Sequence, residues 1–300
     1  MSAIKTILWA CDFFKASNNA LEYANSIAKI FKAEIIGLHV IQEPTWSCYE
    51  VDEEYCERMI KHMKILMTER YETAVKKFQR IASSQKKKRI AFRYCIREGR
   101  ASEEIAKCAQ EEGAQLIIMG NSGDETTLTA TVGSTVFKVM RATHVPTMVV
   151  KKVKRKGSIE RILLPTDLKD SWPKAFDVTL EFADKFKAEI YLLHVIEIYN
   201  YEGVEEVQDQ LLAYATKMIQ ESSNTLKKKA GEIAINEYAR KSINSTIGIL
   251  DFVNKYKIDM VVMGTHARTG LSKFFLGSVA EKVLSELEIP IIAVHPEDEE

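Results

Sequence analysis

Glycines and hydroxyl side chains recur where an apolar run ends, in a pattern suited to holding phosphate. Gly120-Asn121-Ser122-Gly123 is followed, after nine further residues, by Gly133-Ser134-Thr135. Glycine lets a backbone approach a ligand closely and adopt positive φ, and the N–H groups and hydroxyls at a helix start attract anions. The pattern Gly-x2-Gly-x9-Gly-Ser/Thr therefore predicts a phosphate or ribose site. Taken alone, these glycines are equally typical of a tight turn before a serine N-cap.

A related set lies in the second half of the chain. Gly264-Thr265-His266-Ala267-Arg268 precedes Gly277-Ser278-Val279, with alanine where the second glycine stood. If that position needs positive φ, alanine costs about 1 kcal/mol, and its methyl group obstructs close backbone approach. Each half also places an aspartate after its first apolar run, Asp12 and Asp167. No Walker-type phosphate loop, His-Glu-x2-His or Gly-x-Ser-x-Gly motif occurs, so no catalytic constellation is predicted.

An internal repeat relates the two sets. Residues 31–41 read FKAEIIGLHVI and residues 186–196 read FKAEIYLLHVI, with nine of eleven positions identical at an offset of 155. Near the end of each half the offset becomes 144, which pairs Gly133 with Gly277. Such self-similarity indicates duplicated structural units. We expect one domain over 1–152 and another over 158–300, joined by a basic linker at 153–157.

Each copy alternates short apolar runs with segments of helical periodicity. Residues 20–30 are amphipathic at helical spacing, and 52–82 and 204–230 are long, charged and helical in pattern. Short apolar runs, such as 90–95 and 116–119, are typical of buried parallel strands. The alternation predicts an α/β fold made of two tandem doubly wound parallel-sheet domains. Ligands of such sheets bind at the carboxyl ends of strands, where the glycine sets and both aspartates are expected.

These residues carry a family resemblance. Asp12, His39-Val40 and Gly120-x2-Gly123-x9-Gly133-Ser134 resemble the nucleotide-binding type of the universal stress protein family. The second copy is similar in Pro165-Thr166-Asp167, His194-Val195 and the segment from Gly264 to Val283. The resemblance covers about residues 4–150 and 160–295. It implies a Rossmann-like fold related to the adenine nucleotide α-hydrolases, with ATP, ADP or AMP as ligand.

The resemblance also implies a role for each matching residue. Asp12 or Asp167 would contact the ribose or adenosine end, and the backbone of Val40 or Val195 would read adenine. Ribose and phosphates would be held by Gly120, Gly123, Gly133, Ser134 and Thr135 in the first copy, and by Gly264, Arg268, Gly277, Ser278 and Val279 in the second. The terminal strands of the two copies would pair as an intrachain pseudo-dimer, and a homodimer of tandem chains is the alternative assembly.

The two copies depart from the family pattern differently. In the first, Ala10-Cys11 replaces the usual proline before Asp12, and Asp124-Glu125 opens a spacer without Lys or Arg. Two carboxylates repel a triphosphate unless Mg²⁺ or Arg97/Arg100 intervenes. We therefore expect AMP, ADP or adenosine there, or ATP with Mg²⁺.

In the second copy, Arg268 suits phosphate, but Ala267 and the bulky Ile243, at the position of Gly99, are expected to crowd the site. The first copy is thus favoured as the occupied site.

The composition limits which partners and which cellular location we expect. Lys+Arg and Asp+Glu number 42 each, which argues against a nucleic-acid partner. The five cysteines, an odd number, predict reduced thiols, and the absence of a long apolar segment predicts a cytoplasmic protein without a membrane partner. His39 and His194, within apolar runs, are expected to be hydrogen-bonded core residues rather than catalysts. The spacing of Cys48, Cys56 and His62 matches no zinc pattern.

Two functions fit the sequence. The leading hypothesis is an adenine-nucleotide sensor with at most slow ATP hydrolysis, read by an unidentified protein partner. The alternative is a nucleotide-free interaction or scaffold protein whose degenerate pockets take another small molecule or a lipid. A phosphotransfer receiver is a weaker third hypothesis, because no acidic pair lies beside Asp12.

Overall fold

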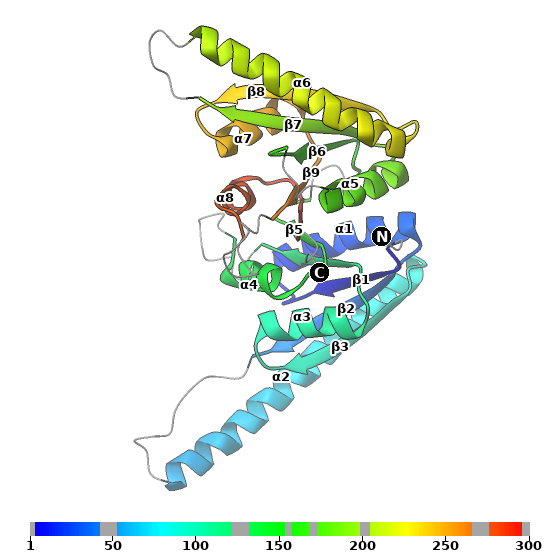
Figure 1. The fold of residues 1–300 in the computed structure, drawn as a ribbon. Helices are drawn as coiled ribbons and strands as arrows, with labels where there is room; N and C mark the ends of the chain where they lie inside the picture. Colours follow the sequence, from blue (N-terminus) through cyan, green and yellow to red (C-terminus); the bar gives the residue numbers. More distant parts are fainter. Residues whose placement is uncertain are drawn as a thin grey trace.

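The computed structural model describes residues 4–42, 53–121, 132–153, 158–168, 173–198, 205–265 and 276–295. Strands and helices alternate in the same order in both halves of this part of the chain (Figure 1). The first half contains β1 (Thr6–Ala10), α1 (Lys15–Phe31), β2 (Glu34–Ile41), α2 (Glu53–Lys87), β3 (Phe92–Glu98), α3 (Ala101–Glu111), β4 (Leu116–Gly120), α4 (Ser134–Ala142) and β5 (Thr147–Val150). The second half contains β6 (Arg161–Pro165), α5 (Pro173–Phe186), β7 (Glu189–Glu197), α6 (Glu205–Ala230), β8 (Ile235–Ser242), α7 (Ser245–Tyr256), β9 (Met260–Gly264), α8 (Ser278–Glu286) and β10 (Ile291–Val294).

The ten strands of the described residues form one sheet in the order β3-β2-β1-β4-β5-β10-β9-β6-β7-β8. Neighbouring strands are parallel within each half. The exception is the central pair, where β5 and β10 run antiparallel with Met148 opposite Ile292. The predicted doubly wound parallel sheets are therefore present, and the expected pairing of the two terminal strands joins them edge to edge within one chain (Figure 1).

Helices bury both faces of this sheet, which is why its strands are continuous apolar runs. In β1, Ile7 and Trp9 belong to the core layer beneath α1, α2, α5 and α6, whereas Leu8 belongs to the layer beneath α3, α4, α7 and α8. This alternation follows from the two-residue period of a strand. Each core layer contains residues of both halves, so the apolar interior is continuous across the central strand pair.

Side chains tie the halves together beside that strand pair. On one face, the ring centroids of Phe31 in α1 and Phe182 in α5 lie 5.3 Å apart. On the other, Arg141 of α4 and Glu281 of α8 form an ion pair of 2.6 Å. His295, directly after β10, is buried and donates from Nε2 to a main-chain carbonyl of α4. The junction is therefore a packed interface.

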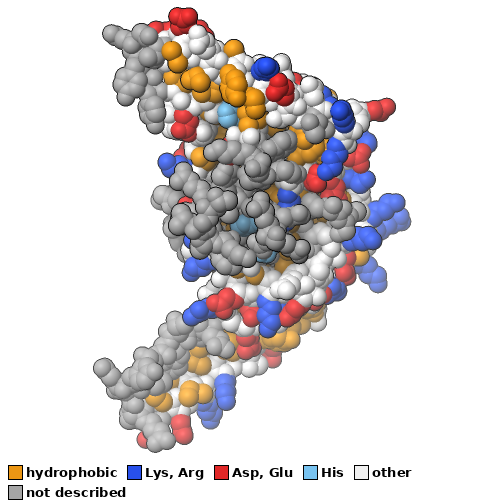
Figure 2. All heavy atoms as spheres, in the orientation of Figure 1, with side chains coloured by type: hydrophobic (Ala, Val, Ile, Leu, Met, Phe, Trp, Pro, Cys, Tyr) orange, Lys and Arg blue, Asp and Glu red, His pale blue; other side chains and the backbone are white. Residues whose placement is uncertain are grey.

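Helix α2 continues well beyond the body that it covers (Figure 1). Its first buried side chain is Ala74, and the described side chains from 54 to 73 are exposed or half-buried. Ile60 and Ile65 are 48% and 50% exposed. Figure 2 shows hydrophobic side chains among charged ones over this outer part of the helix. No helix among the described residues is long and apolar enough to cross a membrane.

Candidate functional site

Among the described residues, each half has a cavity at the carboxyl edge of its parallel strands. The first cavity is about 540 Å³ and the second about 480 Å³. Both are lined by the ends of the first, second and fourth strands of their half and by the first turns of two helices, α3 and α4 or α7 and α8. The chain repeat therefore places equivalent residues around two equivalent pockets, where doubly wound sheets bind ligands.

The first cavity brings together most of the residues predicted for it. Asp12, Val40, Gly120, Gly133 and Thr135 all line it. Ser134 begins α4 beside them but is exposed and is not among the lining residues. Gly123 lies outside the described residues, as does the Asp124-Glu125 pair.

The turn that carries Asp12 is locally constrained. Oδ1 of Asp12 accepts a hydrogen bond of 3.0 Å from the N–H of Phe14. Phe13 between them has φ of 65°, in the left-handed region that side chains avoid. Its ring packs on Phe78, with centroids 5.0 Å apart. The carboxylate of Asp12 is thus held at the strand end by its own turn and by the packing of the next residue.

His39 and Cys11 also line the first cavity, and neither side chain is a reactive group there. Nδ1 of His39 donates to the carbonyl oxygen of Cys11 over 2.7 Å, and burial lowers the pKa of His39. The histidine is satisfied, as predicted, although it is half-buried rather than fully inside the core. Burial raises the pKa of the Cys11 thiol to about 12, so it stays protonated at neutral pH. Neither side chain is set up as a nucleophile.

The two glycines act differently from each other and from expectation. Gly133 has φ of −64° and is the N-cap of α4, so no capping side chain covers the first N–H groups of the helix. Gly120 does not carry positive φ. Instead, a Cβ at Gly120 would lie 2.6 Å from the main-chain carbon of Ala16 and 2.7 Å from the nitrogen of Ser17. Gly120 therefore allows the first turn of α1 to approach the end of β4.

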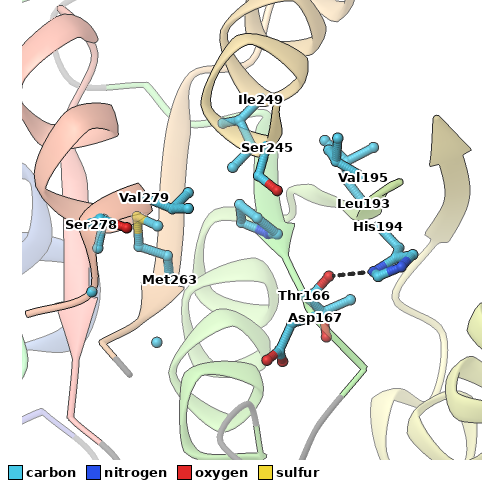
Figure 3. Close-up of a pocket in the computed structure, with 14 residues that line it drawn as sticks. Thr166, Asp167, Leu193, His194, Val195, Ser245, Ile249, Met263, Ser278 and Val279 are labelled. Carbon is cyan, nitrogen blue, oxygen red and sulfur yellow. Dashed lines mark hydrogen bonds between the residues drawn. The ribbon is translucent and has the colours of Figure 1, made fainter. Parts of the chain in front are cut away.

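The second cavity repeats this arrangement (Figure 3). Its lining includes six of the residues predicted for it: Asp167, Val195, Gly264, Gly277, Ser278 and Val279. Ser278 and Val279 lie at the start of α8 on one side, and His194 lies on the other with Nδ1 2.9 Å from the carbonyl oxygen of Thr166. Leu168 repeats the left-handed backbone with φ of 61°. Arg268 and Ala267 lie outside the described residues.

Comparison with known proteins identifies the family to which a chain of this architecture belongs. The model of the universal stress protein family matches residues 3–151 and again residues 158–295. The chain belongs to the universal stress protein family. Its halves are thus two tandem family domains, each with one strand-edge cavity.

Several relatives show the same duplication or a single copy of the unit. A universal stress protein of Archaeoglobus fulgidus DSM 4304 superposes with a TM-score of 0.69 at 20% identity, covering 98% of this chain and 97% of that one. A putative universal stress protein of Pseudomonas aeruginosa UCBPP-PA14 has a TM-score of 0.67 at 18% identity, covering 99% and 95%. Universal stress protein MJ0531 of Methanocaldococcus jannaschii is 31% identical over 141 residues, 45% of this chain and 81% of its own.

The two family domains differ at the rims of their cavities. In the first, Gln42 and Ala101 line the cavity. In the second, the corresponding residues are Glu197 and Ser245, and Glu197 accepts hydrogen bonds from the hydroxyl and the N–H of Ser245 at 2.7 and 2.8 Å. These bonds lower the pKa of Glu197, which therefore carries its negative charge at neutral pH. Glu197 is exposed and does not line the second cavity itself, so its charge acts on an anion there only from beside Ser245.

One expectation about the second cavity is wrong, and two arginines lie away from the first. Ile243 is 57% exposed and does not line the second cavity, so it does not crowd that site. Arg97 and Arg100 do not line the first cavity. Arg97 pairs with Glu104 and Glu111 of α3, because those carboxylates lie within reach on the adjacent helix. Arg100 pairs with Glu103 one turn along. Both guanidinium groups therefore pair with carboxylates of α3 rather than with a group that lines the first cavity.

Sequence reasoning missed part of each lining. Ser17, Ile105 and Asn121 line the first cavity, and Ile249 and Ser245 line the second. Ile105 and Ile249 occupy equivalent positions, 144 residues apart, so the repeat offset would have revealed that pair. Ser17 lies one turn into α1 and gives no motif signal. No group of three or more His, Cys, Asp or Glu side chains that could hold a metal occurs among the described residues.

Proposed function

We propose that the chain binds an adenine nucleotide in its first cavity and acts as a sensor rather than as a fast enzyme. The observation that carries this proposal is the convergence of three features on one cavity. A strand-end aspartate, the main chain at the end of β2 and a glycine-led helix start surround a space of about 540 Å³. Small-molecule and cofactor sites typically occupy ~300–1,000 Å³.

The donors and acceptors present fit the parts of a nucleotide. Asp12 is an acceptor for ribose hydroxyls, since one of its oxygens accepts just one bond from its own turn. The uncapped start of α4 offers main-chain N–H groups and a positive dipole end to phosphate. Val40 and Ile105 provide apolar surface on opposite elements for a flat base. We therefore propose residues 1–152 as one nucleotide-binding domain and residues 158–300 as a second.

Among the described residues that line the cavity, neither the thiol nor the imidazole is activated, which supports sensing over turnover. The Cys11 thiol is held protonated, and His39 already donates to a main-chain carbonyl. A ligand that binds only the folded site stabilises the chain by RT ln(1 + [L]/Kd), ~2.7 kcal/mol at a hundredfold excess over Kd. Because the cavity is built from six separate elements, occupancy would favour one arrangement of them, which a protein partner could read.

The first cavity is the favoured site for an anionic ligand. Gln42 lines the first cavity and is neutral, whereas the corresponding Glu197 is ionised and lies outside the lining of the second cavity, bonded to its lining residue Ser245. The difference is modest, because Glu197 is exposed and water screens its charge. We therefore expect one nucleotide per chain at low concentration, with the second cavity filling later if it fills at all.

Identification of the bound molecule tests the proposal. The chain is purified without added nucleotide and denatured, and the released molecules are identified by chromatography and mass spectrometry. Two variants are designed to fill the cavities with an indole ring. Ala101→Trp fills the first cavity, and Ser245→Trp, at the equivalent position, fills the second. We expect an adenine nucleotide from the wild type and from Ser245→Trp, but not from Ala101→Trp. No nucleotide, together with no thermal shift in millimolar AMP, ADP or ATP, contradicts nucleotide binding. If both variants retain the nucleotide equally, the first cavity is not its binding site.

A second function is favoured by the walls of the second cavity. Leu193, Ile249 and Met263 give it a largely apolar lining, suited to a small apolar molecule in a nucleotide-free interaction protein. An anilinonaphthalene dye discriminates the two functions. Dye bound by the wild type, lost in Ser245→Trp and not displaced by AMP supports this alternative. Displacement by AMP contradicts it.

A further inference from the structure

Two cysteines of the first half face each other behind the first cavity. Cys95 lies on β3 and Cys108 on α3, and their Sγ atoms are 3.7 Å apart. Both are free thiols, and Cys108 is fully buried whereas Cys95 is half-buried. A disulfide has an S–S length of ~2.05 Å, so the sulfur atoms must approach by roughly 1.6 Å to form one.

The two sulfurs have unequal reactivity. A hydrogen bond from the Cys108 thiol, helped by the charge of Arg97, lowers the pKa of Cys95 to about 7, although burial and Glu112 act the other way. The same hydrogen bond, together with burial, raises the pKa of Cys108. The hydrogen bond from Cys108 and the charge of Arg97 thus favour the thiolate of Cys95, which is the reactive form of cysteine. Cys11, buried without a neighbouring thiol, has its pKa raised instead.

The fold does not require a thiol pair at this place. In the sheet register, Cys95 lies beside Leu38, and in the second half Tyr238 lies beside the equivalent Leu193. Cys108 corresponds to Phe252, which is 144 residues further on. Tyr238 and Phe252 pack there with ring centroids 5.0 Å apart. One half thus fills the gap between strand and helix with an aromatic contact, and the other places two sulfurs in it.

We propose that Cys95 and Cys108 form a modification site, which a hydroperoxide converts to an intrachain disulfide that tethers α3 to β3. The thiolate sulfur of Cys95 attacks one oxygen of hydrogen peroxide, and the O–O bond breaks to give Cys95 sulfenic acid and hydroxide, which takes up a proton to become water. The sulfur of Cys108 then attacks the sulfenyl sulfur. The S–O bond breaks, the S–S bond forms, and the departing oxygen leaves as water with the Cys108 proton. Peroxide is reduced, and two thiols are oxidised.

The consequence lies in the wall of the first cavity. Ala101 and Ile105 line that cavity and precede Cys108 on α3, with Ile105 one turn away. Leu38, which also lines the cavity, is the strand neighbour of Cys95. A bond between the two sulfurs therefore fixes α3, which carries one wall of the cavity, to β3. Strand β3 lies beside β2, which carries another wall. This tether acts whatever ligand the cavity holds.

The test follows thiols in the full chain. After brief treatment with hydrogen peroxide at neutral pH, remaining thiols are alkylated under denaturing conditions and peptides are mapped by mass spectrometry. We expect the peptides of Cys95 and Cys108 to be joined, with both thiols recovered by dithiothreitol. Cys108→Ser should stop at a sulfenic acid on Cys95 that dimedone traps. Cys56→Ser is the control and should behave as the wild type.

Two outcomes would overturn the proposal. One is that both thiols stay alkylatable while peroxide is consumed or other cysteines oxidise. The other is that Cys108→Ser gives no trapped sulfenic acid while remaining folded by circular dichroism. Hydrogen exchange supplies a second readout, since amides of α3 should exchange more slowly in the oxidised wild type than in the reduced one. Oxidant should leave their exchange unchanged in Cys95→Ser. Neither readout requires a nucleotide, so the failure of nucleotide binding leaves this test intact.

Discussion

Phe13 and Leu168 each follow a strand-end aspartate, and each has a left-handed backbone. Such a conformation costs ~1–2 kcal/mol for a bulky residue. It persists because, in both halves, the side chain two residues earlier accepts a hydrogen bond from the N–H of the strained residue. Sγ of Cys11 accepts from the N–H of Phe13 at 3.3 Å, and Oγ1 of Thr166 accepts from the N–H of Leu168 at 2.9 Å. Cys11 thus takes the structural role of Thr166, and the strained residue aims each aspartate at its cavity.

Gly120 gives a prediction at this scale. In Gly120→Ala the added methyl group meets main-chain atoms of Ala16 and Ser17, which cannot move without shifting the start of α1. We expect a loss of about 1–3 kcal/mol in the free energy of unfolding, measured by urea denaturation. Gly113→Ala is the control, because a Cβ there has nothing within 4 Å and the cost is limited to its positive φ, about 1 kcal/mol. If Gly120→Ala cost no more than Gly113→Ala, the close approach would not constrain the fold.

The lining residues could be predicted only where a motif names them. Asp12 and Gly133 stand in a spacing pattern, and both line the cavity. The left-handed Phe13 could not be predicted, because phenylalanine does not favour that backbone. The structural role of Gly120 could not be predicted either, because it depends on α1, which lies about a hundred residues earlier in the chain.

Helix α2 illustrates what a pattern of residues does and does not specify about an element. Its periodicity predicted a helix over 52–82, but α2 runs to Lys87 because the lysines form its last turn. Arg89, with φ of 57°, follows the helix, and β3 then begins at Phe92 rather than at 90. The predicted strand over 90–95 was therefore displaced. The helix ends within the basic run, where cations suit the negative end of the helix dipole.

The outer part of α2 should be less protected than its inner part. From 54 to 73 no described side chain is buried, whereas Ala74 and Phe78 are almost fully buried. Helices gain most of their stability from packing, so the outer turns should open at low cost. We expect amides of 56–72 to exchange at least tenfold faster than those of 76–86 in native-state hydrogen exchange. Uniform protection that rises with protein concentration would contradict this account and indicate a homodimer through α2.

At the scale of the whole molecule, one chain builds the pair of sheets through β5 and β10. The pairing itself was implied by family resemblance, and the structure confirms it. The side chains that seal it could not be predicted from sequence. Arg141 and Glu281 are 140 positions apart, and no local pattern joins them. Likewise, His295 at the end of β10 gave no sign that it would bond to Met140.

His295 makes the junction sensitive to acid. Burial lowers its pKa below the ordinary value of 6.5, and the positive charges of His144 and Lys174 act in the same direction. The unfolded chain therefore binds a proton that the folded chain resists, so stability is full above about pH 6.5 and falls as the pH drops below it. We expect urea midpoints to decrease between about pH 6.5 and 5, and less so in His295→Gln, which keeps a donor for Met140. His39, which is half-buried and has its pKa lowered in the same direction, accounts for a remaining slope. An unchanged slope in His295→Gln would contradict this assignment.

The central claim is nucleotide binding in the first cavity, and calorimetric titration with AMP and ATP tests it most directly. Asp12→Asn and Asp167→Asn make the same change in the two equivalent cavities, and at position 12 asparagine keeps the oxygen that accepts from its own turn. One charge-assisted hydrogen bond contributes ~1.5–3 kcal/mol, so Asp12→Asn should weaken binding roughly tenfold or more. Asp167→Asn should leave the tighter binding event unchanged. Equal affinity in the wild type and Asp12→Asn, or no heat with either nucleotide, would contradict the account.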